Sequence, residues 1–449
     1  MSKAPKIITR KTPGRDVKKH RDFRFSADQI PAVDDPRLRQ YRLDAWEAYQ
    51  SLPFPSLQDE AWRRTDIRGL NTDQFELPKK NSSYRTPADR YLNPIATGEE
   101  RAGQIVTGVG QPQRSVAPEV EEKGVIFVDY ATAERDYPDV LDKVLGQAVS
   151  SGEDKFTALS AALASDGVLL YVPEGVVIDQ PLHSLYWGDG ENIAWINHLI
   201  IWLEEGSQVT FVHESASPHE LQDEQIFHSG IVEIHVGRHA RLNFVELQSW
   251  GENVWSFTRE RAKVMGDGYL DWIFGAMGTH LTKNFSDIDL MEAGAIGRMS
   301  GFYFTNGDQH LDHDTQQNHM AKNTTSDLLY KGALMDQSRS VWQGMIYVAP
   351  GAVGTDGYQA NRNLILSKTA RADSIPGLEI LADDVRCTHG ATVGKIDENE
   401  LFYLLSRGIP RWEAEQLIVM GFFTPIMERI PFEGVQVRFI DAIREKMAD

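Results

Sequence analysis

Cysteine is nearly absent from this chain, because Cys387 is the only one in 449 residues. A single thiol excludes an internal disulfide framework and cannot hold an iron–sulfur cluster by itself. Long apolar runs are also missing: none approaches the roughly 20 residues that a membrane-spanning helix needs, and the N-terminus lacks the apolar core of a secretory signal. The composition therefore predicts a protein of a reducing cytoplasm, with no membrane partner.

An excess of positive charge is absent too, because 46 Lys and Arg stand against 65 Asp and Glu. The formal net charge of -19 disfavours nucleic acid as a partner, because phosphate binding needs concentrated lysine and arginine. Residues 1–24 are the exception, since they hold nine Lys and Arg against Asp16 and Asp22. We expect residues 1–35 to form a basic, disordered tail.

Helical spacing follows this tail. Trp46, Tyr49 and Leu52 recur on one helical face before Pro53 ends the pattern, and residues 138–164 show similar spacing. Residues 72–120 between them are polar, carry several Pro and Gly, and have no periodicity. The pattern predicts an N-terminal helical region over 36–165 that contains a polar connector.

Short alternating runs rich in Val, Ile, Phe and Trp then dominate, separated by turns that contain glycine. Four turn glycines lie 31 residues apart: Gly175, Gly206, Gly237 and Gly268. A fixed period of this size is typical of a stacked solenoid. We therefore predict a mainly β fold with a parallel β-helix (solenoid) core over 166–395 and helical regions at both ends. A β-sandwich or double-stranded β-barrel is the competing architecture.

The chain becomes helical again over 396–449. Asp397 with Glu400 three residues later forms a capping-box pattern, and Gly408 is a suitable C-terminal stop. Pro410 suits the first turn of a second helix that runs to Met427.

These two predicted helices carry more apolar side chains than they can bury in each other, so they either pack on the β core or dock a partner. The side chains are Leu401, Leu404, Leu405, Leu417, Ile418 and Phe422.

The densest polar cluster contains His310, Asp312 and His313, which could bind a divalent metal in a β-helix metalloenzyme acting on a sugar or small acid. The spacing is unfavourable, because His310 and His313 would point to opposite faces of a strand. Inward-facing polar residues of a β-helix more often form hydrogen-bonded ladders. This enzyme remains the alternative hypothesis.

Other signatures of catalysis are missing from the sequence. It contains no glycine-rich phosphate loop, no nucleophile elbow and no cysteine-pair zinc motif. We therefore expect a protein that is not an enzyme.

A set of motifs in fixed order resembles the SufB/SufD family of iron–sulfur cluster assembly proteins: the ordered match runs from residue 166 to residue 422, and one further motif lies nearer the N-terminus. The motifs are DEAWRRTD (59–66), LYKGAL (329–334), NRNLILS (361–367), ARAD (370–373), ADDVRCTHGAT (382–392) and LFYLLSRGI (401–409). The Cys-x-His-Gly-Ala-Thr form around Cys387 is most like the SufD branch of the family.

The resemblance implies a right-handed β-helix between helical ends, in a non-catalytic scaffold subunit of the SUF assembly complex. It also implies pairing with a SufB-like paralogue, or a homodimer in its absence, and binding of two copies of a SufC-like ABC ATPase. The apolar helices between 397 and 423 would be the ATPase docking surface.

Cys387 and His389 are the candidate cluster ligands. Two residues apart on a strand, they point to the same side and can face one neighbouring chain, which would supply the missing ligands. We therefore expect transient iron or an iron–sulfur cluster at a subunit interface, and no cofactor on the isolated chain. Ligation by a thiolate and a neutral imidazole releases protons, so occupancy should weaken in acid.

Overall fold

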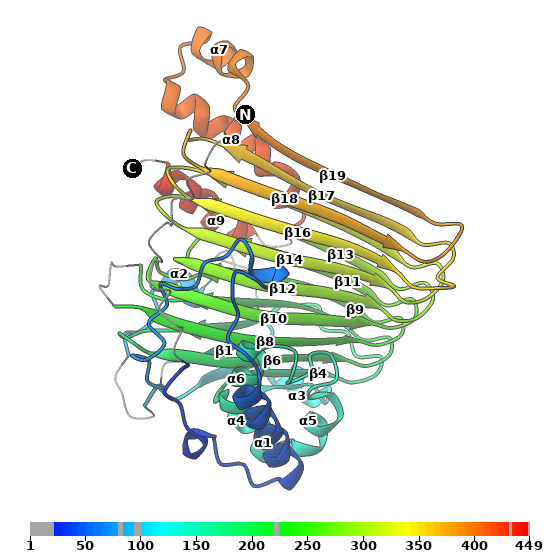
Figure 1. Cartoon of the computed structure of the whole chain (residues 1–449). Coiled ribbons are helices and arrows are strands. Elements are labelled where there is room, and N and C mark those ends of the chain that lie inside the picture. Colours follow the sequence, from blue (N-terminus) through cyan, green and yellow to red (C-terminus); the bar gives the residue numbers. More distant parts are fainter. Residues whose placement is uncertain are drawn as a thin grey trace, which may run out of the picture.

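A computed structural model describes residues 22–79, 84–93, 101–108, 110–219, 224–430 and 433–447 (Figure 1). Strands of two sheets alternate along the chain and stack into a solenoid of about eight turns. Neighbouring strands within each sheet are parallel, except at the N-terminal end, where β1 (Gly103–Thr107) pairs antiparallel with β2 (Gln113–Val116) and β3 (Ile126–Asp129) with β4 (Asp166–Val172). The predicted β-solenoid is confirmed.

The ten-stranded sheet has the order β19-β17-β15-β13-β11-β9-β7-β5-β1-β2. Beyond β1 and β2 its strands are β5 (Leu182–Trp187), β7 (Gln208–Ala216), β9 (Arg241–Ser249), β11 (Tyr269–Ala276), β13 (Ile296–Thr305), β15 (Thr325–Leu334), β17 (Asp356–Ile365) and β19 (Arg386–Lys395). The nine-stranded sheet has the order β18-β16-β14-β12-β10-β8-β6-β4-β3. Beyond β3 and β4 its strands are β6 (Ala194–Leu203), β8 (Ile226–Val236), β10 (Val254–Val264), β12 (Leu281–Leu290), β14 (His310–His319), β16 (Arg339–Val348) and β18 (Arg371–Ile380).

Alternation along each strand sends one set of side chains into the space between the sheets. Phe211, Phe244 and Trp272 from the ten-stranded sheet meet Ile234 and Ala262 from the nine-stranded sheet in one buried cluster. Polar side chains also point inward and bond from turn to turn, as between Ser184 and His213 of β5 and β7 (Oγ to Nδ1, 2.8 Å). The hydrogen-bonded ladders expected from the sequence are therefore present.

The periodic glycines serve two different purposes. Gly175 and Gly206 both adopt φ of +67°, a left-handed conformation that glycine tolerates without strain. At Gly237 a Cβ would lie 2.7 Å from the backbone carbon of Glu204, and at Gly268 it would lie 2.9 Å from the carbonyl oxygen of Gly237. These two positions need glycine because successive turns of the chain approach each other closely.

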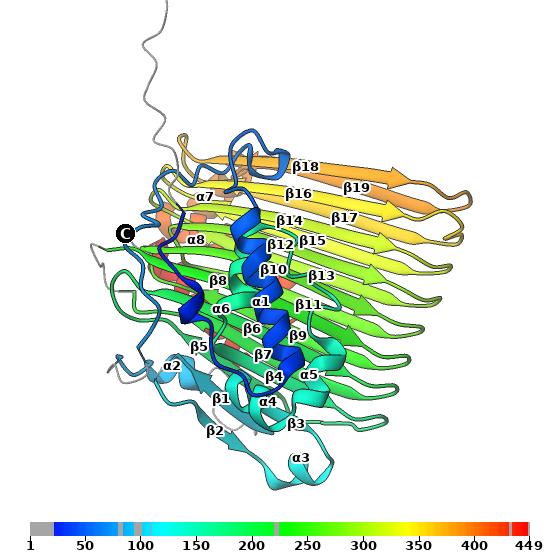
Figure 2. The same cartoon turned by 60° about the horizontal axis from the view of Figure 1, so that its bottom comes forward.

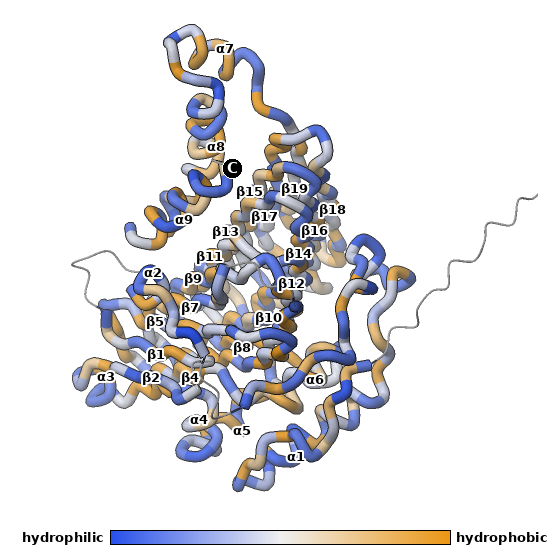
Figure 3. The backbone as a smooth tube through the Cα atoms, turned by 90° about the vertical axis from the view of Figure 1, so that its left-hand side faces the viewer, coloured by the Kyte–Doolittle hydropathy of each residue, from blue (hydrophilic) through white to orange (hydrophobic). Residues whose placement is uncertain are grey.

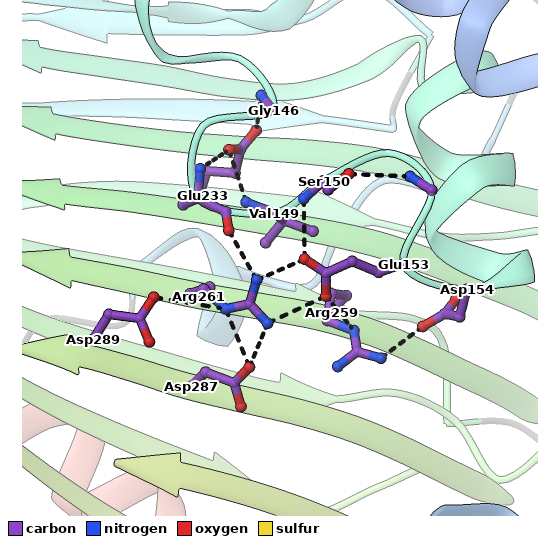
Figure 4. A network of polar contacts seen from close by, with 12 residues as sticks. Gly146, Val149, Ser150, Glu153, Asp154, Glu233, Arg259, Arg261, Asp287 and Asp289 are labelled. Carbon is purple, nitrogen blue, oxygen red and sulfur yellow. Dashed lines mark hydrogen bonds and ion pairs between the residues drawn. The ribbon is translucent and has the colours of Figure 1, made fainter. Parts of the chain in front are cut away.

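The N-terminal region contains η1 (Ala27–Gln29), α1 (Pro36–Ser51), η2 (Glu60–Trp62), α2 (Asp89–Leu92), α3 (Pro118–Glu122), α4 (Tyr130–Asp136), α5 (Pro138–Val144) and α6 (Lys155–Leu163). Helices α1, α4, α5 and α6 share a buried cluster with the outer face of the nine-stranded sheet, and Figure 2 shows α1 lying along it. Helix α2 instead packs through Tyr91 on β1, β5 and β7 of the ten-stranded sheet, and Val120 of α3 is buried in the solenoid interior. Outward-facing Phe227 and Phe257 of the sheet pack against Phe156 of α6. Arg261 of β10 bonds to Glu153 before α6 and to Asp287 of β12, both at 2.6 Å (Figure 4).

Two expectations for the N-terminal region need correction. Residues 1–21 lie outside the described part, but residues 22–35 are not a disordered tail: Phe23, Phe25 and Val33 are buried in the cluster beneath α1. Apolar burial there outweighs the basic composition that suggested disorder. The polar connector also contains β1 and β2, which extend the ten-stranded sheet through pairing of β1 with the distant β5.

The C-terminal helices are α7 (Glu398–Ser406), α8 (Arg411–Met427) and α9 (Glu433–Lys446). The Asp397 carboxylate accepts a hydrogen bond from the Asn399 amide (2.8 Å), and Gly408 takes φ of +82°, so the predicted start and stop of α7 are confirmed. Helices α8 and α9 pack on the outer face of the ten-stranded sheet, while α7 projects away from the solenoid (Figure 3). None of the helices among the described residues is both long and apolar enough to cross a membrane.

Candidate functional site

The last turn of the solenoid, β18 and β19, forms an open end. In the described part of the chain, β18 pairs only with β16 and β19 only with β17, so each strand has one free edge. Leu378, Ile380 and Val393 on these strands are 36%, 39% and 50% exposed. Free strand edges and exposed apolar side chains both favour pairing with another surface.

Cys387 and His389 lie on β19 at this open end. Their register partners on β17 are Gly357 and Gln359, and Gln359 is buried in the solenoid interior. The Cys387 Sγ lies 3.2 Å from where a Cβ on Gly357 would be, so the glycine leaves room for the thiol. Because strand residues alternate, Cys387 and His389 both face the axis of the solenoid, at the end beyond which no further described strand pairs.

The surroundings of the Cys387 thiol favour its protonated form. Burial raises its pKa, and the nearby Asp356 carboxylate adds to the rise against a backbone hydrogen bond from Gly357 that lowers it. A metal ion must therefore displace the proton to gain the thiolate. No group of three His, Cys, Asp or Glu side chains that could hold a metal occurs among the described residues.

The other predicted metal residues do not converge on one site. His313 faces the solenoid interior between Tyr303 and Tyr330, where burial lowers its pKa to about 3. Asp312 faces the opposite side and forms a buried ion pair with Lys283 (3.0 Å). His310 lies on that outer side too, 3.0 Å from the Thr65 hydroxyl, so the two histidines point to opposite faces as the spacing predicts. This geometry argues against the metalloenzyme hypothesis.

The solenoid interior also holds a pair of carboxyl groups. Glu246 accepts a hydrogen bond from the Trp272 indole (3.0 Å), while Glu260 accepts from the Asn284 amide and the Ser286 hydroxyl, both at 2.7 Å. Burial raises the pKa of both groups, and repulsion from Glu260 raises that of Glu246 further. Because two adjacent buried carboxylates repel each other, the pair favours a state that retains a proton.

Glu246→Gln is expected to raise the melting temperature at pH 8, with a smaller difference from wild type at pH 5. A carboxyl whose folded pKa is raised stabilises the fold at low pH, and that contribution is lost as pH rises through the folded pKa. The amide cannot ionise and keeps an acceptor for Trp272. Calorimetry from pH 5 to 8 measures the effect, and Glu174→Gln, an exposed turn residue with the same charge change, is the control. Parallel pH profiles for wild type and Glu246→Gln would contradict the prediction.

The predicted docking side chains of α7 and α8 differ in exposure. Leu405 and Leu417 are 37% and 48% exposed, whereas Leu404, Ile418 and Phe422 are half-buried. Leu401 is buried, so its assignment to a docking surface is corrected.

The sequence pattern did not identify three larger side chains that are exposed on these helices. Phe402, Tyr403 and Trp412 are 72%, 57% and 62% exposed on the projecting part of α7 and α8. Together with Leu405 and Leu417 they form what we call the arm patch. Their aromatic character was a usable signal, because exposed aromatics are enriched at interfaces.

These features define a binding scaffold: a solenoid with an open end, two potential metal ligands that need others, and a projecting helical arm. Two family models match the chain in succession. The SufBD protein N-terminal region matches residues 20–183, and the model described as SUF system FeS cluster assembly, SufBD core domain, matches residues 186–422. The chain belongs to the SufBD family of iron–sulfur cluster assembly proteins.

Its similarity to curated relatives extends over most of both chains. The iron-sulfur cluster assembly protein SufD of Bacillus subtilis is 31% identical over 416 residues, 91% of this chain and 94% of the relative. An iron-sulfur cluster assembly SufBD family protein of Staphylococcus saprophyticus is 32% identical over 409 residues, 88% of this chain and 86% of the relative.

Proposed function

We propose that this chain is a non-catalytic scaffold subunit of a cytoplasmic SUF complex, which pairs with a SufB-like paralogue and docks a SufC-like ABC ATPase. A nascent iron–sulfur cluster, or iron on its way to one, is the cargo. The observation that carries the proposal is the position of Cys387 and His389 at the open end, where an apolar surface and an incomplete ligand set occur together.

A partner that binds the open end would pair with the free strand edges, cover the exposed apolar side chains and add metal ligands. The free edges of β18 and β19 offer backbone hydrogen bonds, and Leu378, Ile380 and Val393 offer apolar area. A SufB-like chain with a similar solenoid end is the occupant that we propose, and a second copy of this chain takes its place when the paralogue is absent. Ligands from the partner would complete the site around Cys387 and His389.

The arm patch is the proposed ATPase contact. Helix α7 is separated from the solenoid, while α8 is anchored on it by Val419 and Phe423 in the cluster beneath α9. Force applied to α7 is therefore transmitted through α8 to the outer face of β13 and β15. ATP-driven movement of the docked subunit would thus reach the wall of the solenoid.

Co-expression with a SufB-like paralogue and a SufC-like ATPase tests both contacts. Leu378→Asp/Val393→Asp is expected to weaken capture of the paralogue at least roughly tenfold while ATPase capture persists, because charge would be buried in an apolar interface. Phe402→Asp/Trp412→Asp should give the converse result. Each double variant is the matched control for the other, and affinity purification with quantified subunit ratios measures both.

Normal paralogue capture by the first variant would contradict pairing through the open end. Normal ATPase capture by the second would contradict docking at the arm patch. Loss of both partners from either variant would show that the two surfaces are not independent.

A further inference from the structure

A cavity of about 470 Å³ lies between α9 and the ten-stranded sheet, away from both the open end and the arm patch. Its volume is within the range of small-molecule sites in proteins. Strand ends of β9 and β11, the turn between β13 and β14, helix α2 and one face of α9 contribute its walls.

The floor of the cavity is apolar. Leu247, Met277 and Phe302 come from the sheet side, and Val435 and Phe439 come from α9. The rings of Phe302 and Phe439 meet edge to face with centroids 4.0 Å apart, which fixes the position of α9 above the sheet. The floor can therefore accept an apolar or aromatic body of a ligand.

Lys446 brings positive charge to the inner wall. Its Nζ donates to the Phe304 carbonyl (3.1 Å), to Asn306 Oδ1 (2.8 Å) and to Gln309 Oε1 (3.0 Å), all of them neutral oxygens. Among the described residues no carboxylate lies within ion-pair distance of it. Burial lowers the pKa of Lys446 to about 7, and the attraction of the Glu252 carboxylate only partly offsets this loss of solvation.

The other charges of the cavity are balanced or lie at its mouth. Arg438 is paired with the buried Glu214, and its guanidinium lies 5.2 Å from the ring centre of Tyr91. Arg90 lies on that ring at 5.0 Å and is exposed at the rim. The lining carboxylates are exposed, and water screens them: they are Glu252, Asp441 and Glu445. Among the described lining residues, Lys446 is therefore the interior basic group without an ion-pair partner.

We propose that this cavity binds a small amphipathic organic anion, with its carboxylate, sulfonate or phosphate group toward Lys446 and its apolar body on the Leu247, Met277 and Phe439 floor. Such a ligand would give the ammonium an ion-pair partner, which it does not have among the described residues, and would bury the apolar floor. It would also bridge α9 to the sheet, so that occupancy stabilises the C-terminal helices. The proposal does not depend on cluster assembly.

Two fluorescent probes of nearly the same shape test the site on the full-length chain: 8-anilinonaphthalene-1-sulfonate and its neutral analogue N-phenyl-1-naphthylamine. The sulfonate is expected to bind wild-type protein saturably, and octanoate is expected to displace it. Lys446→Gln should weaken sulfonate binding about tenfold, the loss of one charge-assisted contact, while the neutral probe keeps its affinity within about twofold.

Arg444→Gln is the matched control, because it removes the same charge from an exposed position of α9 and should leave both probes unaffected. Ala442→Trp, which places an indole in the cavity, should block both probes and so separates this site from apolar surface elsewhere. Equal sulfonate affinities for Lys446→Gln and Arg444→Gln would overturn the proposal. If Lys446→Gln lowered the affinity for both probes equally, the proposal would also be overturned, because the cavity would not select for anions.

Discussion

Cys387→Ala/His389→Ala is expected to reduce cluster assembly by the complete complex at least roughly tenfold, with subunit association unchanged. The two side chains face the solenoid axis at the open end, and the described residues offer no third ligand nearby. Removing both leaves the cluster with ligands from the partner alone. Anaerobic reconstitution, followed by iron and sulfide analysis of the purified complex, measures the yield.

The matched control is Thr388→Ala/Thr392→Ala, which changes exposed residues on the outer face of the same strand. The single variants separate the roles of thiol and imidazole. Burial keeps the thiol protonated, so the exposed His389 is expected to be the first group to contact incoming iron, and His389→Ala should slow assembly more than Cys387→Ala. Wild-type yield from the double variant would mean that the pair is structural.

Glu233→Ala is expected to lower the free energy of unfolding by roughly 3–5 kcal/mol, the range for breaking a buried charged network. The carboxylate of this fully buried β8 residue accepts from the backbone amides of Gly146 (2.8 Å), Ala148 (2.8 Å) and Val149 (3.1 Å) (Figure 4), and it contacts His198 Nε2 at 3.0 Å. Burial opposes its ionisation, but these bonds prevail and lower its pKa. Alanine would leave the three amides without their acceptor.

Urea denaturation measures this loss. Glu233→Gln keeps one carbonyl acceptor and should lose less stability than Glu233→Ala, and Glu205→Ala, an exposed turn carboxylate, should change stability by less than about 0.5 kcal/mol. Equal stabilities of Glu233→Ala and Glu205→Ala would show that the backbone amides before α6 form other hydrogen bonds when the Glu233 carboxylate is removed.

The solenoid and the terminal helices could be predicted because their signals are local. Alternation marks each strand, glycines mark turns, and Asp397 with Gly408 marks the limits of α7. The strands β1 and β2 gave no such signal: β1 is stabilised by pairing with β5, some 80 residues later, and β2 by pairing with β1. Phe23 and Phe25 were assigned to a tail for a similar reason, because Phe23 packs against the distant Phe75 and Phe227, and Phe25 stacks on Phe23.

The candidate site could be predicted only in part. Alternation was enough to place Cys387 and His389 on one face, but not to show that this face lies at an uncovered end of the solenoid. The helical pattern identified α7 and α8 as apolar, whereas the choice of exposed face depends on how Val419 and Phe423 pack on the sheet. Leu401 is buried on α7, which contacts α8, whereas Trp412 near the start of α8 is exposed.

The uneven covering of the solenoid has a consequence for its dynamics. Helices α1 and α6 cover the early turns, whereas β18 and β19 each pair with one strand only among the described residues. In a stack whose turns contact only adjacent turns, local opening is easiest at such an end, so amide hydrogen exchange should quicken toward Cys387. A partner that closes this end would slow the exchange, and the ligand-bearing turn would become rigid only in the assembled complex.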